Sequence, residues 1–210
     1  MAGVTATSLT RMGRSSLDAS IRRGLPGGPG RLVADTHAAF DRLLTRTPWP
    51  TQVANQGYLV LVVLPIAALY TALRERGVAQ HDAVKTVRDV FLASGERERA
   101  LFTLVFRTAL GRRLFLRSLR PNWLWLTPLP ANVWTVTERR RDAVTIEISR
   151  CYRWDTFRLL GIPEVAQVAC DYEEYMFNGS PHLHVTWSSM PAGCEVCRMC
   201  LSSAPTPTHR

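Results

Sequence analysis

The chain has 210 residues, 46% of them hydrophobic and 20% charged, which is the composition of an ordinary soluble globular protein. Its net charge of +9 does not indicate a nucleic-acid partner, because 25 of its 26 basic residues are arginine, a bias that GC-rich coding explains, and no recognisable binding module accompanies them. Five cysteines in a chain this long, and an N-terminus without an apolar segment, predict a cytoplasmic protein with reduced thiols.

Both ends of the chain are expected to be disordered. Residues 1–31 are rich in Ser, Thr, Arg and Gly and show no hydrophobic period, and residues 202–210 contain two prolines and no core residue. Between them, residues 32–201 are predicted to form a single domain.

Four helices are predicted in the first half of this domain, over residues 33–44, 57–73, 81–94 and 98–119. The second is apolar throughout, but it is slightly short for a membrane span and Pro65 interrupts it. We therefore expect a buried core helix with Gly77 as its C-cap, and no membrane partner. In the fourth helix the arginines are expected to be exposed, and the residues expected to be buried are Leu101, Leu104, Val105, Ala109 and Leu116.

The second half changes from helical to alternating periodicity, which predicts strands over residues 133–137, 143–149, 182–187 and 195–201. The last two strands should form a hairpin. Between the second and third strands, one helix is predicted over 152–160 and another from Pro163 onward. The predicted fold class is α+β, with an N-terminal helical half followed by a small, mainly antiparallel four-stranded sheet with two inserted helices.

All five cysteines lie between residues 151 and 200, so a functional site is expected there. Cys194-x-x-Cys197-x-x-Cys200 has the spacing of structural zinc ligands. On a strand, however, Cys194 and Cys200 point to one face and Cys197 to the other, so one ion could not collect all three. We predict no metal ligands and no required cofactor, and a divalent metal is left open.

Two further pairs in this region are able to carry chemistry. His182 and His184 are expected on one strand face, where they suit a metal pair, a general base beside a substrate, or simply two exposed side chains. Cys170 and Glu173 are three residues apart on a predicted helix and share a face. A thiol beside a carboxylate suits nucleophilic or acid–base work only when the pKa of the thiol is lowered, and Cys170 could equally be a small core residue.

Three ordered motifs occur in this region: Cys151-Tyr-x₄-Phe157-x₂-Leu160-Gly161-x-Pro163-Glu164, then Cys170-x₂-Glu173, then Ser189-x₃-Gly193-x₃-Cys197. Together they resemble the L-2-amino-thiazoline-4-carboxylic acid hydrolase family. The resemblance is strong over about residues 130–201, loose over 35–120 and absent at both tails. The chain departs from the family pattern at Glu173 (usually Asp), at Thr186 (usually Arg) and at Arg198 (usually Asp).

The resemblance implies an enzyme that opens a 2-aminothiazoline ring by adding water to its C=N carbon, with a general base, a general acid and donors for the tetrahedral intermediate. The implied catalytic residues are Glu173 as proton shuttle, Cys170 or Cys197 as nucleophile or orienting thiol, and Ser189 as hydrogen-bond donor. The residues expected to contact substrate are Cys151, His182, His184 and Arg198.

We therefore expect a hydrolase-like enzyme that acts on cyclic amidine-type C–N or C–S bonds of a small sulfur- and nitrogen-containing heterocycle, in a specialised (natural product) biosynthetic pathway. The alternative is a non-catalytic ligand- or metal-binding protein on the same scaffold. The expected partner is a small-molecule substrate, and assembly into a homo-oligomer is left open.

Overall fold

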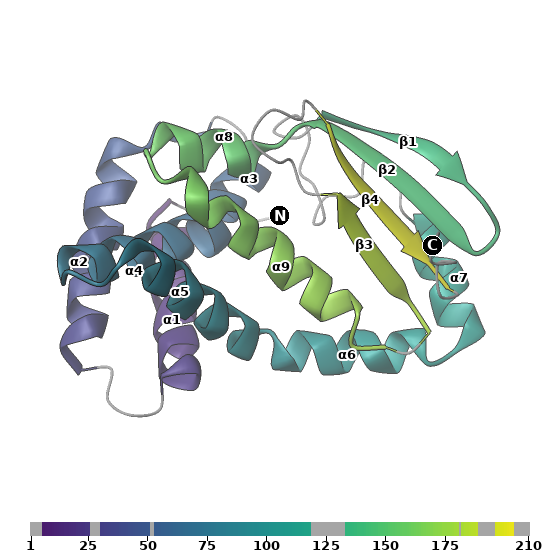
Figure 1. Ribbon diagram of the computed structural model, residues 1–210, viewed down its shortest axis with the longest axis horizontal. Coiled ribbons are helices and arrows are strands. Elements are labelled where there is room, and N and C mark those ends of the chain that lie inside the picture. The colour runs from purple at the N-terminus through teal and green to yellow at the C-terminus, as the bar shows by residue number, and fades with distance from the viewer. Residues whose placement is uncertain are drawn as a thin grey trace. The chain divides into compact units, whose positions relative to one another are not determined.

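The computed structural model describes residues 6–25, 30–50, 53–118, 133–180, 182–188 and 196–203. The fold is α+β, as the sequence predicts: helices come first, and a small four-stranded antiparallel sheet follows (Figure 1). The chain divides into two compact units, and a single domain over residues 32–201 stays a prediction. The first comprises Met1–Ser94 and Arg153–Asp171, and the second comprises Gly95–Tyr152 and Tyr172–Arg210.

The first unit begins with helix α1 (Ala6–Gly24), so the prediction of disorder over residues 1–31 is wrong for this stretch. Leu9, Leu17 and Ile21 are buried along one side of it. Gly13 also lies on that side, where a Cβ atom would come within 2.6 Å of Val60. The sequence shows no clear apolar period here because Gly13 occupies a position of the buried side where a hydrophobic residue would complete the pattern.

Helix α2 (Gly30–Arg46) and helix α5 (Gln80–Ser94) occupy the ranges expected for them, and the long apolar helix lies between them in sequence. This helix runs without a break through α3 (Val53–Tyr58), the π-helical turn η1 (Leu59–Val63) and α4 (Leu64–Glu75). The wide turn precedes Pro65, whose missing N–H leaves the carbonyl four residues earlier without its usual donor. Gly77 ends the helix with φ +81°, which confirms the predicted C-cap.

Among the described residues, Gln56–Glu75 is the stretch long and apolar enough to cross a membrane by length and composition, and 67% of its most apolar window is buried inside the structure. The residues from Leu64 to Tyr70 are all buried. Such burial is what a core helix shows.

The rest of the first unit, Arg153–Asp171, contains most of α8 and the first half of α9. Helix α8 (Tyr152–Leu159) ends at Gly161, and a 3₁₀ turn, η2 (Pro163–Val165), leads into α9 (Ala166–Phe177), as predicted. Two polar contacts hold this region. Arg153, which is buried, donates from Nη1 to the carbonyl of Ala169 at 3.3 Å, and the phenol of Tyr70 donates to the carboxylate of Glu164.

The second unit contains two helices where the sequence predicted one. Helix α6 (Glu96–Phe106) and helix α7 (Ala109–Ser118) are separated at Thr108, whose hydroxyl accepts a hydrogen bond from the N–H of Gly111 at 3.0 Å and so caps α7. The buried face is formed by phenylalanines, with Phe102, Phe106, Phe115 and Phe177 in mutual ring contact.

This aromatic cluster corrects the expected burial. Leu116 is buried as predicted, but Leu101 and Leu104 are 61% and 66% exposed, and Val105 and Ala109 are also exposed. The phenylalanines present more apolar area to the interior than the leucines on the opposite side of α6, and their burial turns the leucines outward.

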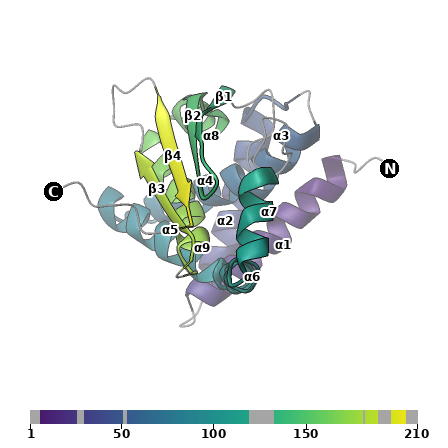
Figure 2. The same cartoon turned by 90° about the vertical axis from the view of Figure 1, so that its right-hand side faces the viewer.

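The sheet consists of β1 (Val133–Arg139), β2 (Ala143–Arg150), β3 (His184–Ser188) and β4 (Cys197–Ser202), in the order β1-β2-β4-β3. All neighbouring pairs are antiparallel, and β3 pairs with β4 as expected. Ser202, assigned from sequence to the tail, ends β4 and is buried. The apolar side chains of one face include Trp134, Ile146, Ile148, Met199 and Val185. Helix α7 lies along one side of the sheet (Figure 2), and Arg139 of β1 donates to the carbonyl of Leu116 at 2.9 Å.

Candidate functional site

The polar face of the sheet brings together reactive side chains from three strands. The register places Cys200 of β4 opposite Thr186 of β3 on one side and opposite Thr145 of β2 on the other. Because side chains directly opposite each other lie on the same face of a sheet, the thiol is flanked by two hydroxyls. Cys200 is half-buried and Thr145 is 9% exposed, so the row is partly shielded from solvent.

His184 lies diagonally to Cys200 on the same face. Its direct partner is Ser202, two residues beyond Cys200 on β4. Diagonal neighbours of an antiparallel pair are separated by about 7–8 Å between Cα atoms, which an aromatic ring can bridge. The Nε2 atom of His184 is buried and has no hydrogen-bonding partner in the described part of the chain.

Arg198 also projects from this face, two residues before Cys200, and is bound by a carboxylate. It faces Glu147 of β2, and its Nε donates to Glu147 Oε1 at 3.0 Å. Arg198 thus stands beside an acid supplied by the neighbouring strand. Its side chain is 62% exposed, so an anionic group of a substrate can reach it.

The other cysteines of the described chain are buried. Cys197 lies on the apolar face of β4 opposite Ile148, with 5% exposure, which confirms that it and Cys200 point to opposite faces. Cys151, between β2 and α8, is also 5% exposed, and Cys170 in α9 is 3% exposed. Buried structural thiols are generally inert, whereas reactive ones are at least partly accessible. Cys194 lies outside the described residues.

Three of the residues implied as catalytic belong to separately described parts of the chain. Cys170 is in the first unit, whereas Glu173, which is half-buried, and Cys197 are in the second. Ser189 lies outside the described residues. That these side chains act together in catalysis, as the resemblance implies, stays a prediction.

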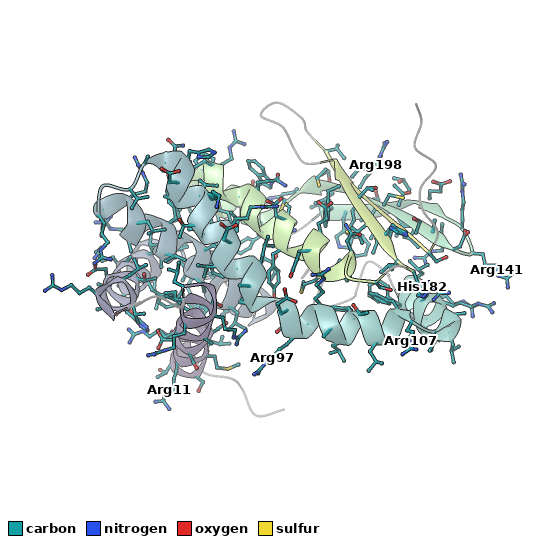
Figure 3. All side chains as sticks on the ribbon, turned by 60° about the horizontal axis from the view of Figure 1, so that its bottom comes forward. Arg11, Arg97, Arg107, Arg141, His182 and Arg198 are labelled. Carbon is teal, nitrogen blue, oxygen red and sulfur yellow. The ribbon has the colours of Figure 1, made fainter. Side chains whose placement is uncertain are left out.

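His182 does not lie on the strand with His184, so the expected histidine pair is wrong. It is exposed in the turn before β3, where its N–H donates to the hydroxyl of Ser180 at 3.2 Å (Figure 3). Strand β3 begins at His184, next to Val185, which is held by two hydrogen bonds to the side-chain amide of Asn178. The N–H of Val185 donates to Oδ1 at 2.7 Å, and Nδ2 donates to the carbonyl of Val185 at 3.1 Å.

From sequence, Cys200 was considered only as a possible zinc ligand, and Thr145 and Ser202 were not expected to be functional. The alternation of Thr145 and Glu147 with apolar residues did place both on the polar face, but only the strand order brings them beside Cys200. Within the described ranges, no group of three or more His, Cys, Asp or Glu side chains could hold a metal ion.

Comparison with known proteins adds no assignment. No family model, curated protein or solved structure matches the chain.

Proposed function

We propose that the protein is a hydrolase-like enzyme that opens a small sulfur- and nitrogen-containing heterocycle at a C=N carbon, and that Cys200 and His184 on the polar face of the sheet carry the reaction. The observation on which this rests is the position of Cys200. Among the described cysteines it is the one that is not buried, and it lies diagonally to an imidazole whose Nε2 has no partner in the described residues.

A thiol within reach of an imidazole supports nucleophilic catalysis at an electrophilic carbon. Here the two side chains are diagonal neighbours, and no hydrogen bond joins Cys200 to Nε2 of His184 in this structure. In the first step the Cys200 sulfur bonds to the C=N carbon, the ring C–S bond breaks, and the thiol proton passes through His184 to the departing ring sulfur. Water then adds to the carbon, which is still bound to Cys200. One water proton ends on nitrogen and the other returns through His184 to the Cys200 sulfur as that C–S bond breaks. The product carries a carbamoyl group.

The neighbouring side chains suit the same chemistry. The hydroxyl of Thr186 flanks Cys200 on one side and is able to donate to the tetrahedral intermediate. On the other side the hydroxyl of Thr145 donates to Glu138 Oε2 at 3.4 Å. Arg198 supplies a cation on the same face for an anionic substituent of the substrate. The implied proton shuttle Glu173 is a competing candidate for the acid–base role.

The test is turnover of 2-aminothiazoline-4-carboxylate by the purified protein, with the intact mass followed for an adduct on sulfur. We expect Cys200→Ser to abolish both the adduct and turnover, and His184→Gln to slow turnover about 100-fold or more. His81→Gln, which changes a largely exposed imidazole on α5, is the control and should retain activity. Cys170→Ser and Glu173→Gln test the roles implied by the resemblance, and loss of turnover in these variants with Cys200→Ser active would move the reaction to α9.

Alkylation provides an independent check of the site. Iodoacetamide should modify Cys200 before Cys151, Cys170 and Cys197 when native protein is treated briefly and its peptides are analysed by mass spectrometry. A thiol that reacts no faster than the buried three would remove the observation on which the proposal rests. The second candidate, a non-catalytic ligand-binding protein, is supported by the arginine-lined pocket described next.

A further inference from the structure

A pocket of about 610 Å³ lies within the second unit, between α7 and the turn that joins β1 to β2. Its basic lining residues are Arg112 and Arg113 from α7 and Arg141 from the turn. Leu110 and Leu116 of α7 provide apolar wall, and Asp142 provides the one acidic side chain of the lining. Figure 3 shows Arg141 at the tip of the hairpin.

Backbone contacts fix the walls of this pocket. The N–H of Arg140 donates to the carbonyl of Ala143 at 2.8 Å and closes the hairpin, and the N–H of Ser203 donates to the carbonyl of Asp142 at 2.7 Å. On the other side, Arg112 Nη1 donates to the carbonyl of Phe106 at 2.7 Å, which holds that guanidinium at the start of α7. The pocket is therefore formed by ordered elements of the fold.

The charges in the pocket are not balanced by the protein. Three arginines and one aspartate leave a formal charge of +2 in the lining. Within the described residues Arg113 and Arg141 form no ion pair, whereas exposed arginines elsewhere, such as Arg42 with Glu75, do. Both guanidinium groups are exposed, and because they reach one concave space from different elements they are able to bind the same anion.

We infer that this pocket binds a small molecule in which a phosphate monoester is joined to an apolar group. A phosphate monoester carries a charge of about −1.5 to −2 at neutral pH, which is opposite to the formal charge of the lining. Two of its oxygens accept the paired N–H donors of one guanidinium. Leu110 and Leu116 then contact the apolar group. The site is separate from the Cys200 face. Arg139 of β1, which contacts α7, is the cross-strand partner of Val144 and so lies on the apolar face of the sheet. Cys200 is the cross-strand partner of Thr145 and lies on the polar face.

Isothermal titration with phenyl phosphate at physiological ionic strength tests this inference on the full chain. Phenyl phosphate should bind at least about 10-fold more tightly than inorganic phosphate, which lacks the apolar group, and than benzoate, which has a single charge. Arg113→Gln and Arg141→Gln should each weaken phenyl phosphate binding about 10-fold or more. Arg107→Gln removes an exposed arginine that does not line the pocket and should change the Kd less than about twofold.

Equal binding by the wild type, Arg107→Gln, Arg113→Gln and Arg141→Gln would show that the anion binds the basic surface without a site, and this would overturn the inference. Benzoate binding as tightly as phenyl phosphate would overturn the phosphate assignment. Unchanged far-UV circular dichroism in every variant confirms that binding is compared between folded proteins. Cys200→Ser should bind phenyl phosphate as the wild type does, so the outcome does not depend on the proposed hydrolysis.

Discussion

Arg198 and Glu147 face each other across β4 and β2 and form an ion pair on the polar face of the sheet, next to Cys200. The pair is exposed on the arginine side and half-buried on the carboxylate side, with 62% and 27% of the side chains accessible. The ion pair holds the Arg198 guanidinium on the same face of β4 as Cys200, the candidate nucleophile.

The Arg198–Glu147 pair should contribute little to stability. Exposed ion pairs are worth about 0.2–1 kcal/mol and weaken with salt. We expect Arg198→Gln and Glu147→Gln each to lower the free energy of unfolding by less than about 1 kcal/mol, with a coupling energy of similar size in the double variant. Urea denaturation at low and high salt measures both. A coupling above about 2 kcal/mol would show a shielded pair instead.

Tyr70 should make the stability of the first unit dependent on alkaline pH. Burial of Tyr70 and its hydrogen bond to the Glu164 carboxylate raise the pKa of the phenol from 10.0 to about 12. A group whose pKa is raised by folding contributes its stabilisation fully below its unfolded pKa and loses it as the pH rises through the folded one. Stability should therefore fall between about pH 10 and pH 12.

Tyr70→Phe isolates this effect. At pH 7 the variant loses one hydrogen bond, which is worth about 1 kcal/mol. The difference in unfolding free energy between the wild type and Tyr70→Phe should shrink from pH 10 upward as the phenol ionises, and denaturation at pH 8, 10 and 11 follows it. A difference that grows with pH would contradict the assigned protonation state.

Gly24 should be required for the packing of α1 against α5. A Cβ atom at this position would lie 2.5 Å from the Cα of Val90, so the two backbones would have to separate. We expect Gly24→Ala to lower the unfolding free energy by about 1–3 kcal/mol. Gly57 in α3 has nothing within 4 Å of such an atom, and Gly57→Ala should be neutral or raise stability by up to about 1 kcal/mol. Equal effects of the two substitutions would mean that α1 does not pack on the fold.

Phe106 and Leu104 should differ sharply in their contribution to stability although they are two residues apart on α6. Phe106 is fully buried among the other phenylalanines, and Leu104 is 66% exposed. Phe106→Ala should cost about 3–5 kcal/mol, whereas Leu104→Ala should change stability by less than about 0.5 kcal/mol. Thermal or chemical unfolding of both variants decides whether the phenylalanine face or the leucine face of α6 is the interior one.

Periodicity alone was sufficient to predict the types of most elements. Helices α2, α4 and α5 and the four strands after residue 132 lie close to their expected ranges, because apolar residues recur at the spacing of the structure that they form. The sequence missed α1 and predicted one helix where α6 and α7 occur. Local chemistry also placed the helix ends at Gly77 and Gly161, where both glycines have positive φ. These features depend on residues that are close together in the chain, so the sequence is sufficient to predict them.

Only the tertiary structure decided which of two apolar faces is buried and which reactive side chains are neighbours. Helix α6 has leucines on one side and phenylalanines on the other, and contact with Phe115 and Phe177 selects the phenylalanines. Helix α1 has few hydrophobes and is held by the close approach of Gly24 to Val90. The Cys-x-x-Cys-x-x-Cys spacing drew attention to three thiols. Strand order instead placed Cys200 between Thr145 and Thr186 and near His184, because pairing between strands joins residues that are far apart in the chain.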